Sequence, residues 1–467
     1  MKRKAVLNVV GLTAGLVQRM PRLREFASSR HVLSIVPAFP AVTCTAQSTY
    51  LTGLNPSDHG IVGNGWYDRE SAEVQFWKQS NRLVHGRKLW EELREIVPGF
   101  TCAKLFWWYN MYSTADYSIT PRPMYPADGR KIFDIHTAPL DIRFAIKKDL
   151  GDFPFRSFWG PGAGISSSQW IADSAKWIEE RYRPTLSLVY LPHLDYNLQR
   201  LGPSNPAIAG DLEALDQLLC DLIAYLQQRD IDVVVLSEYG ISDVDRPIHI
   251  NRILREQGWI AIKDELGLEM IDCGASKVFA VADHQIAHVY ANDAALLTAA
   301  REILASQPGV QSVLGRDEQA ALGIAHERGG DLVVVADRRS WFTYYYWLDS
   351  AVAPDFARTV DIHRKIGYDP AELFIDSAIK FPPARIATFL LKKKLGFRTL
   401  LDVIPLDATL VKGSHGRVPE TAEDRPLLII DRQLNGIPDE LPAQQVYGVL
   451  RAFSLAHNMT HQSVWSE

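Results

Sequence analysis

Two short apolar runs with a helical pattern between them constrain the fold most strongly. Residues 186–191 (LSLVYL) and 232–236 (DVVVL) are short and dominated by apolar and β-branched side chains, so each predicts a buried parallel strand. Between them, apolar residues recur at helical spacing, at Leu212, Leu215, Leu218, Leu219, Ile223 and Leu226. A strand, a crossover helix and a second strand predict a doubly wound α/β sheet, whose functional residues collect at the carboxyl ends of the strands.

The rest of the chain fits one large α/β domain over residues 1–467, with two departures from regular structure. Residues 5–12 predict a buried first strand, because Asn8, Gly11 and Thr13 interrupt what would otherwise resemble a secretory signal. Residues 110–165 are rich in Pro, Gly and aromatic residues and predict an irregular insertion over the sheet edge. Residues 255–335 contain two strand-like runs around a helical pattern and predict a small cap subdomain.

Composition excludes several classes of partner. The 467 residues are 47% hydrophobic and 22% charged, which is enough for a large core. A net charge of −5 gives no reason to expect a nucleic-acid polymer or an anionic membrane, and no run approaches the ~18 apolar residues of a membrane span. The four cysteines have no paired spacing. We therefore expect a cytoplasmic protein that is not bound to a membrane, with its oligomeric state left open.

Residues 39–53 (FPAVTCTAQSTYLTG) predict a loop that enters a helix at Thr43, and the helix ends at Gly53. A hydroxyl at a helix N-terminus faces unpaired backbone N–H groups and the positive end of the helix dipole. That position suits the binding of a phosphate or the stabilisation of an alkoxide that attacks one. Thr is also a favoured N-cap, so Thr43 alone leaves both interpretations open.

Four segments carry a resemblance to a known family. Residues 39–64 contain the run TGLNPSDHGI and then Asn64, and later segments read DYNLQRLGP (195–203), SEYGI (237–241) and GSHG (413–416). In this order they resemble the nucleotide pyrophosphatase/phosphodiesterase branch of the alkaline phosphatase superfamily. The resemblance implies an alkaline-phosphatase-like three-layer α/β sandwich, with a mostly parallel central sheet, helices on both faces and a small inserted cap.

The resemblance also implies a mechanism. Thr43 would be the nucleophile, and Asn64 would donate a hydrogen bond to the negative charge that develops on the phosphoryl group. The family uses two divalent metals, usually zinc, and manganese also suits such donors. The family's metal-ligand positions are occupied here by Asp195, Glu238, His415, Gln199, Tyr239 and Thr13.

Four of these positions depart from the family pattern, because Thr13, Gln199, Glu238 and Tyr239 stand where it has Asp, His, Asp and His. One interpretation is a site rebuilt around one metal or around new ligands, for which His193, His249, Asp361 and His363 are candidates, with Arg364 as a substrate-binding cation. Tyr239 can instead donate a hydrogen bond to substrate or nucleophile.

The first interpretation predicts a metal-dependent hydrolase of phosphate or phosphonate esters, acting on a small phosphorylated molecule. The alternative is a family member that has lost the hydrolase machinery and acts as a ligand-binding protein.

Overall fold

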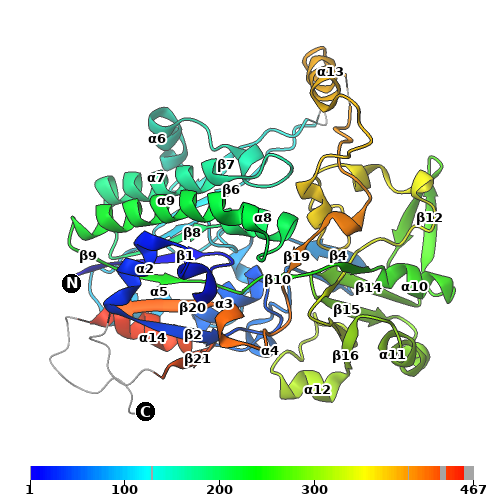
Figure 1. Ribbon diagram of the computed structural model, residues 1–467, viewed down its shortest axis with the longest axis horizontal. Helices are drawn as coiled ribbons and strands as arrows, with labels where there is room; N and C mark the ends of the chain where they lie inside the picture. The colour runs from blue at the N-terminus through cyan, green and yellow to red at the C-terminus, as the bar shows by residue number, and fades with distance from the viewer. Residues whose placement is uncertain (1, 128–129, 398, 432–437, 457–467) are drawn as a thin grey trace.

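The main sheet forms the centre of the molecule. Figure 1 shows the computed structural model, which describes residues 2–127, 130–397, 399–431 and 438–456. Nine strands pair in the order β21 (Glu440–Pro442), β2 (Arg30–Val36), β20 (Leu427–Asp431), β9 (Ile231–Leu236), β1 (Arg3–Val9), β8 (Leu186–Leu191), β5 (Cys102–Leu105), β6 (Tyr117–Pro121) and β7 (Ile135–Ala138). β9, β1, β8, β5 and β6 run parallel, whereas β20 and β7 are antiparallel to their neighbours. The mostly parallel sheet predicted from the sequence is confirmed.

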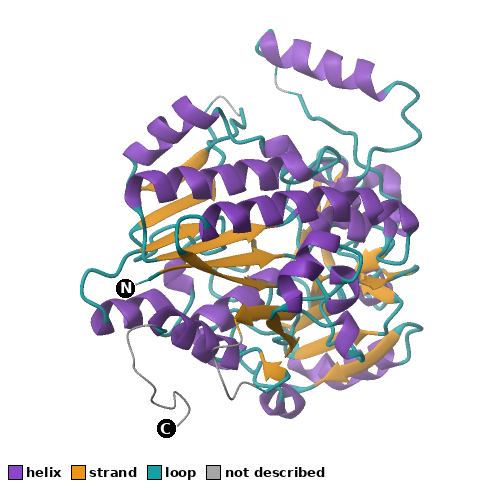
Figure 2. Ribbon diagram, turned by 60° about the vertical axis from the view of Figure 1, so that its left-hand side comes forward, coloured by secondary structure: helices purple, strands orange, loops and turns teal. Residues whose placement is uncertain are grey.

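Helices cover both faces of this sheet, which gives three layers (Figure 2). One face carries α2 (Pro21–Ser28), α7 (Ile165–Tyr182) and α9 (Ala209–Gln227), and α7 and α9 pack on each other and on β8 and β9. The other carries α3 (Thr43–Thr52), α5 (Leu89–Ile96) and α14 (Gln445–Leu455). The leucines predicted to form a crossover helix lie on α9 and are buried in the main core. None of the helices in the described ranges is long and apolar enough to cross a membrane.

A second, smaller sheet lies beside the first. Its four antiparallel strands follow the order β14 (Val278–Asp283), β15 (Ile286–Ala291), β17 (Leu332–Ala336) and β16 (Val310–Leu314). It packs with α10 (Ile250–Glu256), α11 (Leu297–Ala305) and α12 (Arg316–Ala321). The aromatic run 341–347 is buried in the core of this part. These residues include the segment for which the sequence predicts a cap, and their role as a cap stays a prediction.

Short two-stranded pairings complete the strands. They are β3 (Gly65–Asp68) with β4 (Glu73–Phe76), β10 (Ser242–Asp243) with β19 (Gly413–Ser414), β11 (Arg246–Ile248) with β18 (Ser340–Phe342), and β12 (Ala261–Glu265) with β13 (Leu268–Asp272). The remaining α-helices are α1 (Ala14–Val17), α4 (Pro56–His59), α6 (Asp141–Leu150), α8 (His193–Leu201) and α13 (Pro382–Lys394).

The segment 110–165 is more regular than its composition indicates. Its residues supply β6 and β7, which extend the main sheet by two strands, and the helix α6, which packs on β7 and α7. The prediction of a wholly irregular insertion is therefore wrong. The Pro and Gly residues occupy the connections, while the strands are only five and four residues long and give too short a pattern to recognise.

The strand ends place the candidate residues on one side of the sheet. α3 begins at Thr43, and Gly53 ends it in the left-handed conformation, with φ of 72°. All ten residues of α3 are buried, so the helix lies inside the molecule and not on its surface. Asp195 lies in the first turn of α8, directly after β8, and Glu238 follows β9 by two residues. This is the arrangement expected of a doubly wound sheet.

Candidate active site

Thr43 lines a large cavity, whose buried end around this residue we call the floor. It is the first residue of α3, its side chain is 4% exposed, and it lines a cavity of ≈ 1970 Å³. Its Oγ1 lies 3.1 Å from the hydroxyl oxygen of Tyr239. Val42, not Thr43, occupies the N-cap position, so the hydroxyl is not used to cap its own helix. The interpretation of Thr43 as a simple cap is therefore wrong.

The Tyr239 hydroxyl joins Thr43 to Asp195. Tyr239 donates to Asp195 Oδ1 at 3.2 Å, so its oxygen is left to accept the proton of the Thr43 hydroxyl. The second carboxylate oxygen of Asp195 accepts from Gln199 Nε2 at 2.8 Å, and Gln199 Oε1 accepts from the Tyr368 hydroxyl at 2.9 Å. Burial raises the pKa of Asp195 to about 7, although both hydrogen bonds oppose the rise.

Glu238 is completely buried on the sheet side of Thr43. Its Oε1 accepts from Asn8 Nδ2 at 2.5 Å and from Gln47 Nε2 at 2.6 Å, while its Oε2 has no hydrogen-bond partner among the described residues. Burial raises the pKa of Glu238 to about 8, and the hydrogen bonds from Gln47 and Asn8 oppose that rise. One oxygen of this carboxylate is therefore held and the other is free.

Asp283 links the second sheet to the loop after α3. It is the last residue of β14, and it accepts from the Asn64 backbone N–H at 2.8 Å and from Asn64 Nδ2 at 3.0 Å. The same carboxylate accepts from His284 Nδ1 at 2.8 Å. His284 lines the cavity that contains Thr43, and its Nε2 makes no hydrogen bond to the described residues. Burial lowers the pKa of His284 well below its usual range, so the ring is neutral and Nε2 is a proton acceptor.

The His415 ring lies between the rings of Tyr239 and His284. Its Nδ1 donates to the Ala41 carbonyl at 2.8 Å, and its Nε2 stands 4.0 Å from Asp195 Oδ1. Its ring stacks on Tyr239 with 3.6 Å between centroids and lies 3.7 Å from the ring of His284. Burial lowers its pKa well below the usual range. The stacking contact with His415 holds the Tyr239 ring in position.

The chain matches the model of a known protein family. The model for type I phosphodiesterase / nucleotide pyrophosphatase matches residues 5–369. The chain belongs to this family. The predicted resemblance to the nucleotide pyrophosphatase/phosphodiesterase branch is thus confirmed.

Two curated relatives of this family come from yeasts. An uncharacterized pyrophosphatase/phosphodiesterase of Schizosaccharomyces pombe is 26% identical over 53% of this chain and 46% of its own length. The ectonucleotide pyrophosphatase/phosphodiesterase 1 of Saccharomyces cerevisiae is 24% identical over 46% of this chain and 29% of its own length. The matched part thus spans less than half of either relative.

Solved structures share the fold at low identity. Murine ectonucleotide pyrophosphatase / phosphodiesterase 5, in an inactive variant in complex with AMP, is 12% identical, covers 99% of this chain and 97% of its own, and gives a TM-score of 0.59. Phosphonoacetate hydrolase from Sinorhizobium meliloti, in complex with phosphonoformate, is 15% identical, covers 97% and 96%, and gives 0.60. At these identities the comparison establishes the fold of the family and nothing finer.

The donors in this family member do not fit a two-metal centre. Within the described residues there is no group of three or more His, Cys, Asp or Glu side chains that could hold a metal ion. Gln199 turns its nitrogen, not its carbonyl oxygen, toward Asp195, and Tyr239 supplies a protonated hydroxyl. At the six family positions only Asp195, Glu238 and His415 are strong donors, and one Glu238 oxygen is occupied by two amides. Structural zinc sites use four protein ligands, and catalytic ones use three.

Several residues that the sequence predicts as ligands lie apart from the residues around Thr43. Thr13 caps α1, where its hydroxyl accepts from Leu16 N at 3.3 Å, and Asn8 is the first-strand residue that reaches Glu238. Thr13 therefore does not stand at a ligand position in the site. His193 faces Asp211 at 3.3 Å, and His249 bonds to Thr343 at 2.8 Å, so neither joins the residues around Thr43.

Asn64 lies near Thr43 and is held in place through both ends of its amide. Its Oδ1 accepts from Cys44 N at 3.0 Å, and its Nδ2 donates one of its two protons to Asp283 at 3.0 Å. The second Nδ2 proton has no partner among the described residues, and an oxyanion role for Asn64 would use that proton. As placed, Asn64 ties the first turn of α3 to the second sheet, and its catalytic role stays a prediction.

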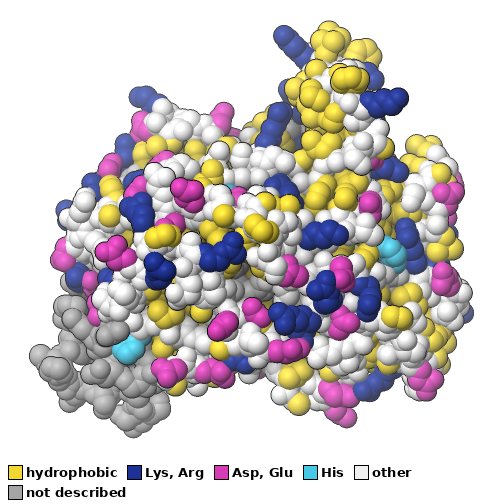
Figure 3. All heavy atoms as spheres, viewed as in Figure 1, with side chains coloured by type: hydrophobic (Ala, Val, Ile, Leu, Met, Phe, Trp, Pro, Cys, Tyr) yellow, Lys and Arg dark blue, Asp and Glu magenta, His cyan; other side chains and the backbone are white. Residues whose placement is uncertain are grey.

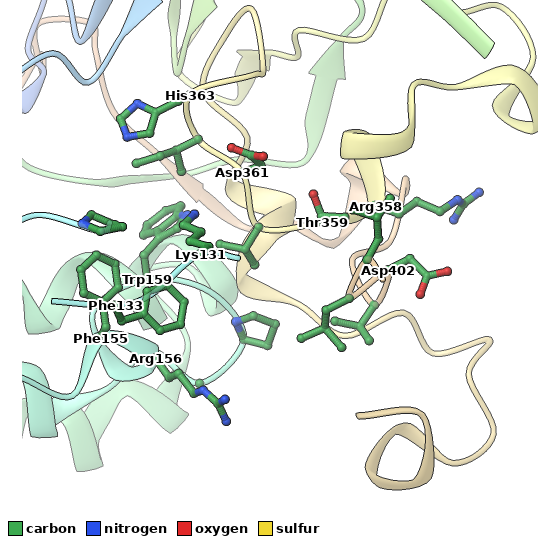
Figure 4. A pocket seen from close by; sticks show the side chains of 18 of the residues that line it. Lys131, Phe133, Phe155, Arg156, Trp159, Arg358, Thr359, Asp361, His363 and Asp402 are labelled. Carbon is green, nitrogen blue, oxygen red and sulfur yellow. The ribbon is translucent and has the colours of Figure 1, made fainter. Parts of the chain in front are cut away.

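The segment 361–364 divides between the cavity and the surface. Asp361 and His363 line the cavity, and Figure 4 shows both on one loop, on the side opposite the rings of Phe133 and Phe155. His363 Nδ1 lies 3.3 Å from the Phe76 carbonyl oxygen. Arg364 pairs with Asp355 at 3.2 Å and is not among the cavity residues. A substrate role remains a prediction for Asp361 and His363, and Arg364 lacks the position for it.

Sequence reasoning did not find Asp283, His284 and Tyr368 as site residues. Asp283 and His284 follow a strand of the second sheet, 240 residues after Thr43, and no motif marks them. The available signal was a pair of ionisable residues directly at a strand end, the same signal that identified Asp195 and Glu238.

Proposed function

We propose that the chain hydrolyses a phosphate or phosphonate ester, with Thr43 as the nucleophile. The observation that carries the proposal is the hydrogen-bonded series from Thr43 through Tyr239 to Asp195 at the floor of a cavity. Family membership supports phosphodiester or pyrophosphate chemistry. The substrate is a small anionic molecule, because nine basic residues line the cavity: Arg122, Arg130, Lys131, Arg156, Arg358, Arg385, Lys392, Lys393 and Lys394.

In the first step the Thr43 oxygen attacks phosphorus. Its proton passes to the Tyr239 oxygen while the Tyr239 proton passes to Asp195 Oδ1, so the net result is a threonine oxygen bonded to phosphorus and a neutral Asp195. The bond from phosphorus to the leaving oxygen breaks as the new bond forms, and the leaving oxygen takes a proton from solvent. Burial raises the pKa of Asp195 to about 7, which makes its carboxylate a better proton acceptor than an exposed one.

In the second step water cleaves the phosphothreonine. His284 Nε2, held in place by Asp283 through the other ring nitrogen, accepts a proton of the attacking water and then releases it to solvent, because burial keeps the pKa of the ring low. The phosphorus–Thr43 bond breaks, and Thr43 regains its proton from Asp195 through Tyr239 in the reverse of the first transfer. Every group named here lines one cavity or contacts a residue that does.

The predicted two-metal chemistry with zinc or manganese forms no part of this mechanism, because the donor set does not fit a two-metal centre. Metal analysis of the purified protein, with turnover measured before and after dialysis against a chelator, tests this point. Turnover that survives chelation supports the hydrogen-bonded route. Turnover that is lost on chelation and restored by zinc or manganese overturns the route and supports the metal-dependent prediction.

The decisive experiment replaces the nucleophile. Thr43→Ala should reduce turnover of aryl phosphodiester, monoester and phosphonate substrates by at least about 10³-fold, and Thr43→Ser should restore part of it. Thr52→Ala is a matched control, because Thr52 ends the same helix and bonds only to Ser48 and Leu54. Equal turnover in Thr43→Ala and the wild type would contradict the proposal.

The altered positions also favour a second function, a relative that binds a phosphorylated ligand without turning it over. Gln199 and Tyr239 are held in a continuous series of hydrogen bonds that runs from Thr43 through Asp195 to Tyr368, which is consistent with a static site. In that case the wild type should show no turnover on any of the substrates, while calorimetry with a non-hydrolysable phosphonate still detects binding.

A further inference from the structure

α13 and its flanking residues form an arm at the mouth of the cavity. We call residues 380–397 the α13 arm; Figure 1 shows its helix standing away from both sheets. No residue of α13 is buried. The arm is tied to the body by Arg385, which pairs with Asp402, and by Lys393, which donates to the Lys131 carbonyl at 3.5 Å. Ile386 also packs against a small buried cluster of the body. The arm therefore has few of the contacts that usually stabilise a helix in a protein.

Large apolar side chains of the arm face solvent. Phe381 is 75% exposed, Leu391 58%, Leu395 66% and Phe397 64%. Leu391 and Leu395 are four residues apart and share one face of the helix, whereas Ile386 and Phe389 line the cavity. A helix that is apolar on its outer as well as its inner face is normally covered by something. Single exposed apolar residues need no explanation, but a group of this size does.

The charge of the arm is opposite to that of the whole chain. Residues 380–397 contain five Lys or Arg residues and no Asp or Glu, while the chain carries a net −5. Lys392 and Lys394 have no ion-pair partner among the described residues. Figure 3 shows the apolar atoms gathered on this projection with basic atoms at its edges. Exposed Leu and Phe side chains beside clustered lysines are typical of a segment that lies in an anionic lipid interface.

We propose that the α13 arm docks on an anionic lipid surface. The outer side chains Leu391 and Leu395 enter the acyl boundary. Lys392, Lys393 and Lys394, which also line the mouth of the cavity, contact the anionic headgroups. The net charge alone predicts no such attraction, because it averages the arm with an acidic body. The inner side of the arm lines the cavity that holds Thr43, so docking brings the cavity mouth to the lipid. This inference goes beyond the proposed hydrolysis and does not depend on it.

Co-sedimentation of the full chain with lipid vesicles tests the proposal. The protein should bind vesicles that contain phosphatidylserine and phosphatidylcholine, bind pure phosphatidylcholine vesicles weakly, and dissociate as salt is raised. Leu391→Ser combined with Leu395→Ser should weaken binding at least about tenfold. Neither leucine lines the cavity, so turnover of a soluble substrate should stay unchanged in this variant and a failed docking test leaves the hydrolase proposal untouched.

Two matched controls distinguish docking through the α13 arm from non-specific binding to vesicles. Phe144→Ser removes an equally exposed apolar side chain, 68% exposed, from α6 and should leave binding unchanged. Replacing all three arm lysines 392–394 by Gln should weaken binding about a hundredfold. The same change in net charge made at the exposed Lys148, Lys263 and Lys412 should have a much smaller effect.

Three results would overturn the proposal. The wild type would fail to bind anionic vesicles, or the double serine variant would bind as well as the wild type. In the third, light scattering would find a dimer that the double serine variant abolishes, with no vesicle binding by either protein. That result would show that a second copy of the chain covers the arm.

Discussion

The floor of the cavity and the α13 arm at its mouth are built in opposite ways. Around Thr43, polar groups are buried and hydrogen-bonded: Asp195, Gln199 and Tyr368 follow one another in a continuous series. In the arm, apolar side chains such as Leu395 are exposed, and the described contacts to the body are few. Burying polar groups costs free energy unless each finds a partner, and exposing apolar groups costs free energy unless something covers them.

The difference separates two kinds of function. A floor whose groups are held in place can position reacting atoms, because its side chains have little freedom left. The apolar side chains at the mouth of the cavity are exposed, so they are suited to contact another molecule or surface. The same cavity thus combines a site built for orientation with a rim built for association.

Removal of the Tyr239 hydroxyl tests the hydrogen-bonded series at the floor of the cavity. Tyr239→Phe keeps the ring that stacks on His415 but loses the hydrogen bonds to Thr43 and Asp195. We expect kcat to fall about a hundredfold with the melting temperature nearly unchanged, because proton transfer by a positioned group contributes about 10²–10⁴-fold. Steady-state kinetics on a soluble phosphodiester measures the effect.

Tyr225→Phe is the control for that change, since the Tyr225 hydroxyl bonds to Lys176 and Glu180 far from Thr43 along the helices α7 and α9. A Tyr239→Phe enzyme that keeps the wild-type kcat would show that the hydroxyl only fills space. A change confined to KM would mean that Tyr239 binds the substrate and does not carry a proton.

Much of the floor was accessible from the sequence because its residues follow strands with a clear apolar pattern. β8 and β9 are six-residue runs without polar alternation, and the residues after them, Asp195 and Glu238, were predicted as site residues. The start of α3 at Thr43 and its end at Gly53 were predicted from turn and cap chemistry. Local patterns were sufficient for these elements.

The rest depends on long-range packing, which no local pattern reports. Asn8 was visible only as a polar residue that interrupts an apolar strand, and its bond to Glu238 requires β1 and β9 to be neighbours. Asp283 meets Asn64 only because the second sheet packs against the loop after α3. The departure of Gln199 from the family's imidazole could be read from the sequence, but the Tyr368 hydroxyl that fixes its orientation could not.

The buried His59 beside α3 should make the stability of the cavity floor depend on pH. His59 is completely buried, its Nδ1 accepts from Ile61 N at 3.0 Å, and its Nε2 lies 3.0 Å from Thr49 Oγ1 on α3. Burial lowers the pKa of His59 to about 3. Above pH ~6.5 the ring is neutral in the folded and unfolded chains, so it adds no pH dependence. As pH falls from ~6.5 toward 3, only the unfolded chain binds the proton, and the free energy of unfolding decreases by up to ~1.4 kcal/mol per pH unit.

Urea unfolding at pH 7, 6 and 5 measures this slope. His59→Gln should be less stable than the wild type at pH 7 but should lose stability less steeply between pH 6 and 5. His85→Gln, at an exposed position, should follow the wild-type slope. An unchanged slope in His59→Gln would show that other buried histidines account for the acid sensitivity of this region.

The smallest expected effect compares the same substitution at both places. Leu51 on α3 is 4% exposed and Leu391 on α13 is 58% exposed. Leu51→Ala should lower the free energy of unfolding by about 2–5 kcal/mol, because a buried cavity is created. Leu391→Ala should change it by less than about 0.5 kcal/mol, since the side chain is already in water and an exposed alanine favours a helix. Urea unfolding of both variants checks the pair. A loss of more than about 1 kcal/mol in Leu391→Ala would mean that the arm packs against the body in solution, and the apolar mouth would then belong to the fold and not to a partner.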